Sequence, residues 1–300
     1  MPKPNKQSDS ITAKFMNAAL ARKGAATLTK VRYQGTFSAL EAHAKKERWG
    51  TVDPTSLTFK QLKGFAATRM KSHSLRTVHN EMSHIRRALQ GVWREDFASK
   101  ECQNQNLGVP KASRKGSGLV VDPKVLQRAL ERAPADTKAL IELSRSLGLR
   151  LREAVSAADS LREWGKALAQ GQAITVRDGS KGGRVRFVVV APGGLDRAID
   201  AVKAAQEVLK QRKYLVDSVS LKAATEQLSD RLAKLGLKGE NSCHSLRRAF
   251  AMDQYKNYLA VGCSEKVALR RTANDLGHGD SRGWIVTNNY IGPSMRAAAS

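Results

Sequence analysis

The sequence predicts a mainly α-helical protein of two domains that carries one small β-hairpin. Apolar residues recur at helical spacing along most of the chain, and the period becomes strand-like only over residues 173–190. Three hundred residues exceed one average domain, and a polar stretch without periodicity begins at residue 100. We therefore expect a disordered tail over residues 1–10, a helical domain over 11–99, a basic linker over 100–121 and a mixed α/β domain over 122–300.

The charge of the chain predicts an anionic partner. Lys and Arg total 52 against 27 acidic residues, which gives a net charge of +25 and a pI near 10.3. Residues 1–115 hold 22 basic and 8 acidic side chains, and residues 116–300 hold 30 and 19, so both domains share the excess. This distribution favours two domains lining one polyanion, such as DNA, over a basic tail on a neutral domain.

The cysteines and the N-terminus bear on the compartment. Cys102, Cys243 and Cys263 form an odd set without CxxC spacing, which argues against a disulfide framework or a zinc site and fits a reducing cytoplasm. The N-terminal residues lack the apolar core of a signal peptide, and no apolar run reaches the length of a membrane span. We expect a soluble cytoplasmic protein without membrane contact.

Four helices are predicted in the N-terminal domain. The first begins at Ser10, the second carries Tyr33 to Ala44, and Thr58 and Ser74 are N-cap candidates for the third and fourth. The fourth helix has an apolar stripe, and its other face is either solvated or directed at DNA. The candidate DNA-binding residues on that face and in the linker are Arg76, His79, Arg86, Arg87, Lys111, Arg114 and Lys115.

The C-terminal domain is predicted to begin at Asp122-Pro123, an N-cap followed by proline in the first turn. One long helix is expected to carry Leu140 through Ala154, and a Gly-rich turn with Lys181 at its tip joins two strands into a hairpin. Further helices are expected over Leu195–Leu209, Leu221–Leu235, His244–Gly262 and Ser264–Leu276.

Four short motifs in this domain carry residue types that handle phosphate. GLRLREA places Arg150 and Glu153 three residues apart, and HSLRRAF places His244 and Arg247 on one helix face. LGHGD sets His278 just past a helix end, and TNNYI supplies Tyr290. Arginine and histidine can neutralise phosphate oxygens, and a tyrosine hydroxyl can attack phosphorus. Tyr255 and Tyr258 lie two to three turns beyond Arg247, too far along the helix to reach the same phosphate.

The order of these motifs resembles that of the tyrosine recombinases, the phage-integrase-type site-specific recombinases. The resemblance implies a SAM-like helical core-binding domain followed by a catalytic integrase domain. It implies catalytic roles for Arg150, Lys181, His244, Arg247, His278 and Tyr290, with Glu153 supporting Arg150 and Arg248 in contact with DNA. The interval from His278 to Tyr290 is a few residues longer than in common members, and only ten residues follow Tyr290.

The resemblance also implies a reaction. Tyr290 would attack the DNA backbone to form a 3′-phosphotyrosyl link, Lys181 would protonate the leaving 5′ oxygen, and His244 would help to manage the proton of Tyr290. No metal, cofactor or ATP is expected. The resemblance implies a homo-oligomer that forms a tetrameric synapse on double-stranded DNA and integrates or excises a mobile element. An accessory directionality factor would act with it. The alternatives are a type IB topoisomerase-like relaxing enzyme and a non-catalytic DNA-binding relative, and Lys181 has the alternative of a solvated hairpin tip.

Overall fold

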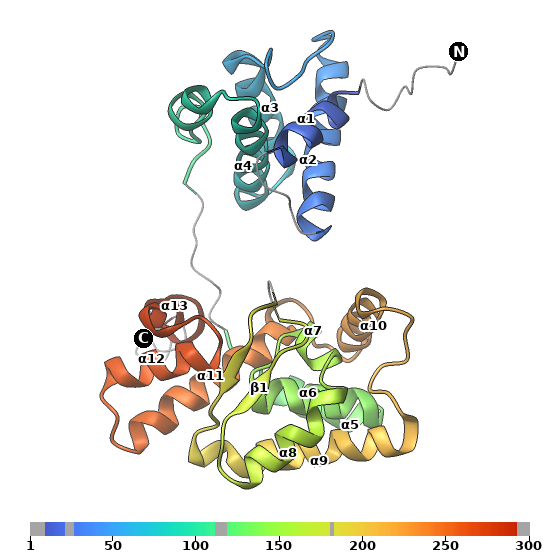
Figure 1. The fold of residues 1–300 in the computed structure, drawn as a ribbon, viewed down its shortest axis with the longest axis vertical. Helices are drawn as coiled ribbons and strands as arrows, with labels where there is room; N and C mark the ends of the chain where they lie inside the picture. The colour runs from blue at the N-terminus through green and yellow to red at the C-terminus, as the bar shows by residue number, and fades with distance from the viewer. Residues whose placement is uncertain (1–9, 22–26, 112–118, 181–182, 293–300) are drawn as a thin grey trace. The chain divides into compact units, whose positions relative to one another are not determined.

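The computed structural model describes residues 10–21, 27–111, 119–180 and 183–292. The chain divides into two compact units, Met1–Arg114 and Lys115–Ser300, each with its own hydrophobic core. Helices dominate both units, and the described strands form one antiparallel pair, so the predicted fold class is confirmed (Figure 1). None of the described helices is both long and apolar enough to cross a membrane. The tail expected at residues 1–10 lies outside the described residues except for Ser10.

The first unit is built from four helices and a short π-helical turn. These are α1 (Ile11–Leu20), α2 (Thr27–Lys46), α3 (Phe59–Ser72), α4 (Leu75–Gly91) and η1 (Phe97–Glu101). The two predicted caps are confirmed: Ser74 accepts a hydrogen bond from the first turn of α4, and Thr58 forms a capping box with Gln61. Ser10, where the first helix was expected to begin, caps α1 in the same way. The apolar stripes of the four helices meet in one core, to which Phe15, Phe37, Leu62, Phe65 and Met82 contribute fully buried side chains.

The linker expected from residue 100 begins later than predicted. Cys102, Leu107 and Val109 are buried in the core of the first unit. Arg86 Nη1 donates to the carbonyl of Cys102, and the carbonyl of Pro110 lies 2.7 Å from His79 Nε2, so α4 fixes this segment along its length. The segment has no periodicity because single apolar side chains, and not a helix face, make its contacts. Residues 112–118 are outside the described range.

The second unit contains the remaining elements. Its helices are α5 (Pro123–Arg132), α6 (Ala135–Leu147), α7 (Leu151–Val155), α8 (Leu161–Ala169), α9 (Leu195–Arg212), α10 (Leu221–Lys234), α11 (Cys243–Ala260), α12 (Glu265–Asp275) and α13 (Gly283–Val286). The turns η2 (Ala158–Ser160), η4 (Pro192–Gly194), η5 (Gly239–Asn241) and η6 (Asp280–Arg282) are 3₁₀-helical, and η7 (Thr287–Ile291) is π-helical. Helix α6 packs on α9 and α11 in the middle of this unit. The helix α8 has no counterpart among the sequence-based expectations.

The predicted hairpin is confirmed, with strands β1 (Ile174–Val176) and β2 (Arg186–Val188). Val176 pairs with Arg186 and Ile174 with Val188, so these four side chains point to the same, buried face. The indole of Trp164 in α8 donates to the carbonyl of Thr175 at 2.8 Å and holds the hairpin on the core. Lys181 lies outside the described residues.

The long helix expected from Leu140 through Ala154 is wrong, because it is broken in two. Helix α6 ends at Leu147, and Gly148 follows with φ +59°, a left-handed conformation that favours glycine. Arg150 is extended and caps the new helix α7, whose Glu153 side chain accepts the Arg150 backbone N–H at 2.8 Å. The break places Arg150 at the start of a new helix.

Candidate active site

The candidate site lies where the start of α7, the start of α11 and the end of α12 meet. Arg150 Nη1 donates to Glu153 Oε1 at 2.6 Å, and the Glu153 side chain is fully buried while that of Arg150 is 30% exposed. The buried carboxylate of Glu153 therefore fixes the Arg150 guanidinium on its protein-facing side, and the solvent-facing side of the guanidinium stays exposed. This is the pair that the GLRLREA motif predicts, formed across the first turn of α7.

Arg247 in α11 is held by main-chain carbonyls. Its terminal nitrogens donate to the carbonyls of Gly148 and Leu276, which follow the last residues of α6 and α12. The side chain is 1% exposed, and its Nε has no partner among the described residues. Carbonyls at helix C-termini carry partial negative charge and suit a buried cation. Its Nη1 also lies 3.8 Å from Glu153 Oε2.

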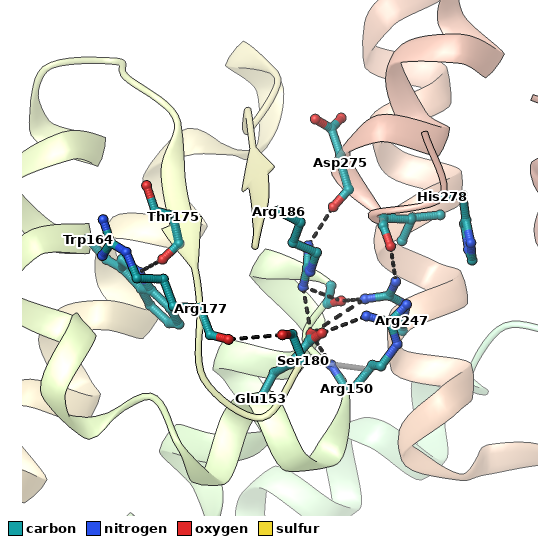
Figure 2. Close-up of polar contacts among 12 residues, drawn as sticks. Arg150, Glu153, Trp164, Thr175, Arg177, Ser180, Arg186, Arg247, Asp275 and His278 are labelled. Carbon is teal, nitrogen blue, oxygen red and sulfur yellow. Dashed lines mark hydrogen bonds and ion pairs between the residues drawn. The ribbon is translucent and has the colours of Figure 1, made fainter. Parts of the chain in front are cut away.

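A third arginine, Arg186 in β2, completes this cluster and was not among the predicted site residues. Its Nη2 donates to Glu153 Oε2 at 2.7 Å and to the carbonyl of Gly148 at 3.3 Å, and its Nη1 donates to the carbonyl of Asp275 at 2.5 Å. Figure 2 shows the guanidinium of Arg186 between Asp275 and Glu153, with Arg247 on one side. Three guanidinium groups thus surround one carboxylate.

The side chain of Asp275 joins three elements behind the site. It accepts hydrogen bonds from the backbone of Val189, from Gln254 and from the Tyr258 hydroxyl. Burial raises the pKa of Asp275 to about 6, although these three donors oppose the shift. The buried Tyr258 hydroxyl donates its hydrogen bond to Asp275, so this tyrosine is not positioned to act as a nucleophile.

Tyr290 lies in the same site as the histidines and Arg247. His278 Nε2 is 3.1 Å from Tyr290 Oη, and the ring centroids of His278 and His244 lie 5.6 and 5.8 Å from that of Tyr290. Tyr290 is 4% exposed in the π-helical turn η7. The extra residues between His278 and Tyr290 form η6 and α13, which carry the chain back over α12. The longer interval therefore still delivers the tyrosine to the site.

The electrostatic environment sets the protonation of these groups. Desolvation and then nearby arginines, Arg248 beside His244 and Arg247 beside His278, lower the pKa of each histidine to about 4, so both imidazoles are neutral at pH 7. Burial and the charge of Arg186 lower the pKa of Arg247 to about 10, which leaves it charged. Burial opposes ionisation of Glu153, but Arg186 and Arg247 outweigh it and lower its pKa to about 2. The site is therefore cationic, with two neutral imidazoles beside the arginines.

The remaining predicted site residues are Arg248, which lies beside His244, several residues of the first unit, and three that are not described. Lys181, Arg114 and Lys115 are outside the described residues. Arg248 is partly buried, and its Nη1 donates to the carbonyl of Leu119 at 3.3 Å. In the first unit, Arg76, His79, Arg86 and Lys111 line an open groove of about 460 Å³, in which Arg86 also binds Asn104. Arg87 Nε donates to the carbonyl of Ala19.

The sequence did not identify Arg186 and Asp275 as site residues, because their hydrogen-bonding partners are distant in the sequence. In a strand such as RVRFV an arginine usually faces solvent, and Val185 and Phe187 beside Arg186 are in fact exposed. One signal was present: Arg186 and Val188 share the face opposite to those two exposed residues. A buried arginine needs an acidic partner, but the sequence does not say that this partner is Glu153.

Comparison with known proteins bears on the fold and on the family of this chain. The family model described as Integrase matches residues 108–253. The fold is similar to that of the Tn1549 transposon integrase in complex with transposon right end DNA, with TM-score 0.62, 15% identity and coverage of 96% of this chain and 98% of that one. A lambda integrase tetramer bound to a Holliday junction is similar with TM-score 0.55, 19% identity and coverage of 94% and 83%.

The XerH site-specific recombinase bound to its difH substrate is similar with TM-score 0.54, 20% identity and coverage of 91% and 79%. None of the curated protein sequences compared with this chain matches it significantly. The structural likenesses establish the shared fold, and the Integrase match spans α5 to α11, which includes Arg150, Glu153, His244 and Arg247. Residues 108–253 of this chain thus match the Integrase family model, and the chain shares its fold with three DNA-bound integrases and recombinases.

Proposed function

We propose that this protein is a site-specific DNA recombinase that cleaves and rejoins strands through a covalent bond between Tyr290 and DNA. The observation that carries the proposal is the position of the Tyr290 hydroxyl, 3.1 Å from His278 Nε2 in a site where the charges of Arg150 and Arg247 act on His278. A hydroxyl, a neutral base and two fixed cations are what attack on a phosphodiester needs. The Tn1549, lambda and XerH proteins were each solved with DNA, which supports DNA as the substrate.

His278, and not His244, is proposed to receive the proton of Tyr290. His278 is the imidazole within hydrogen-bonding distance of the hydroxyl, and its low pKa keeps it neutral and able to accept. In the tautomer with Nδ1 protonated, Nε2 points a lone pair at Tyr290. As Oη forms its bond to phosphorus, its proton passes to His278 Nε2. His244 then serves as a hydrogen-bond donor to a phosphate oxygen at the start of α11.

Arg150 and Arg247 are proposed to bind the non-bridging oxygens of the scissile phosphate. Attack by Tyr290 increases negative charge on these oxygens, and two fixed guanidinium groups stabilise that charge more in the transition state than in the ground state. Arg150 has an open outer side, and Arg247 retains an Nε without a protein partner among the described residues. Glu153 holds Arg150 in place.

The remaining steps follow from the chemistry of the phosphodiester. The bond from phosphorus to the 5′ oxygen breaks as the bond to Tyr290 forms, and Lys181 is proposed to protonate the departing oxygen. The 3′-phosphotyrosyl link keeps the energy of the broken bond, so a free 5′-hydroxyl from a partner strand can reverse the step. We place this exchange in a homo-oligomeric synapse of four protomers, since lambda integrase was solved as a tetramer on a Holliday junction.

DNA is proposed to contact both units. The basic groove of the first unit, with Arg76, His79 and Lys111, and Arg248 of the second unit would bind backbone phosphates. We further propose that the protein acts in the cytoplasm on a mobile element, as the likeness to a transposon integrase supports, and that an accessory factor sets the direction.

The test is the covalent adduct. A DNA duplex nicked beside the cleavage position traps the phosphotyrosyl link, which survives denaturant on a gel. Wild type and the control Tyr214→Phe, which alters an exposed tyrosine of the same unit, should form the adduct, and Tyr290→Phe should form none while binding DNA normally. His278→Gln should slow adduct formation more than His244→Gln does. An adduct that persists in Tyr290→Phe would refute the assignment, and relaxation of plasmids without a recombination site would favour a topoisomerase.

A further inference from the structure

The buried arginine in β2 has no role in the proposed reaction, although it lies in the centre of the cluster. Arg186 is 5% exposed, and both of its terminal nitrogens bind protein acceptors, namely Glu153 and the carbonyls of Gly148 and Asp275. Burying a guanidinium costs several kcal/mol unless its interactions replace its hydration. A valine at this strand position would fill the core without that cost, so a structural role alone does not account for the charge.

The contacts of Glu153 suggest what the charge does. Glu153 is the acidic side chain that ion-pairs with Arg150 at 2.6 Å and lies 3.8 Å from Arg247, so its negative charge acts on both proposed phosphate-binding residues. One carboxylate between two cations would cancel half of the positive charge offered to the phosphate. Arg186 supplies a third cation, at 2.7 Å from the other carboxylate oxygen. The described cluster then holds three positive charges and one negative charge.

We propose that Arg186 is a positioning residue that neutralises Glu153, so that Glu153 can orient Arg150 without weakening the attraction of Arg150 and Arg247 for the scissile phosphate. This inference rests on the proposed function. Arg186 acts through Glu153, and its terminal nitrogens bind that carboxylate and the carbonyls at the ends of α6 and α12 (Figure 2). The strand β2 thereby connects the hairpin to the charge of the site.

The first experiment separates charge from folding. Arg186→Gln and Arg186→Lys are compared with wild type and with Arg177→Gln, a matched control that loses an exposed arginine–glutamate pair just after β1 in the same hairpin. Adduct formation is measured at saturating DNA, after DNA affinity and circular dichroism have shown that the variants bind and fold. Arg186→Gln should form the adduct about 10 to 100 times more slowly, as is typical when a group that orients an active-site ligand is lost. Arg186→Lys, which keeps the charge, should recover most of the rate.

A neutral substrate sharpens this comparison. A methylphosphonate in place of the scissile phosphate removes one negative charge, so attack on it depends less on the net charge of the pocket. The defect of Arg186→Gln relative to wild type should therefore shrink several-fold on this substrate. An equal defect on both substrates would mean that the substitution only disturbs the fold, and it would overturn the proposal.

A double substitution distinguishes action through Glu153 from direct contact with DNA. If Arg186 works by neutralising Glu153, then Glu153→Gln in the Arg186→Gln background removes the charge that needed neutralising. The double variant should cleave no more slowly than the slower single variant, which is strong non-additivity. Losses that multiply would show that Arg186 acts independently of Glu153 and would overturn the proposal. If wild type itself forms no adduct, the proposed function fails, whereas wild-type rates in Arg186→Gln would defeat this inference alone.

Discussion

Replacing Glu153 by glutamine should destabilise the second unit by an amount that depends on pH. The pKa of Glu153 falls from 4.5 to about 2 because Arg186 and Arg247 outweigh the desolvation of the buried carboxylate. A difference of that size between the folded and unfolded states corresponds to about 3 kcal/mol of stability from the ionised group at pH 7. Removing one partner of a buried ion pair costs about 3–5 kcal/mol in other proteins, which agrees in magnitude.

The sign of the pH dependence follows from the lowered pKa. Because the folded pKa lies below the unfolded value, the contribution of Glu153 is fully present above pH 4.5 and is lost as the pH falls toward 2. The free energy of unfolding of Glu153→Gln should therefore lie about 3 kcal/mol below that of wild type at pH 7, and only about 2 kcal/mol below it at pH 3.5.

Native-state hydrogen exchange in peptides from α6 and α11 measures this difference, since these helices pack on each other in the core of the second unit. The first unit of the same molecules serves as an internal control. Glu163→Gln, which removes an exposed carboxylate from its pair with Arg177, should leave the exchange unchanged. A difference between wild type and Glu153→Gln that stays constant from pH 7 to 3.5, or that is too small to measure at pH 7, would refute the three-arginine account of this carboxylate.

Two further predictions concern the glycine at the helix break and the histidines. Gly148→Ala should destabilise the second unit by roughly 2–5 kcal/mol, because φ is +59° and the new Cβ would lie 2.3 Å from the Phe250 ring. The control Gly171→Ala, at φ +65° in open space, should cost only about 1–2 kcal/mol. Equal losses of stability in urea denaturation would contradict the clash with Phe250. In an NMR titration of the free protein, His244 and His278 should titrate near pH 4, with their signals identified by Gln variants. The stability that their neutral forms give is therefore fully present above pH 6.5 and is lost as the pH falls toward 4. Titration midpoints at or above 6.5 would contradict a cationic site around the two imidazoles.

Local signals in the sequence predicted much of the secondary structure. Thr58, Ser74 and Asp122 each cap the helix expected of them, since a cap is formed by residues within one turn. The change from helical to strand-like periodicity at residue 173 predicted the hairpin, since its two strands are close in sequence. The break at Gly148 was missed because apolar residues continue at helical spacing on both sides of it, and the periodicity does not register one residue in a left-handed conformation.

Non-local geometry accounts for what the sequence did not predict in the site. The motifs named Arg150, Glu153, Arg247, His278 and Tyr290, which the structure brings together in one site. They did not tell which imidazole meets the tyrosine, because the spacing from His278 to Tyr290 does not reveal that η6 and α13 fold the chain back. Arg186 could not be assigned, since its three acceptors come from elements 33 to 89 residues away.

The carbonyl acceptors of Arg186 and Arg247 have a consequence for how this site would tolerate random substitution. Gly148, Asp275 and Leu276 bind the two guanidinium groups through backbone oxygens, which no side-chain replacement can remove. In a saturation library, Leu276 should therefore accept other apolar residues of similar volume. Gly277 should not, because its φ is +70° and a Cβ there would lie 2.8 Å from Arg186 Cδ. Inactivating substitutions should thus be frequent at glycines that do not contact the substrate. Their positions would mark the main-chain segments that surround Arg186 and Arg247.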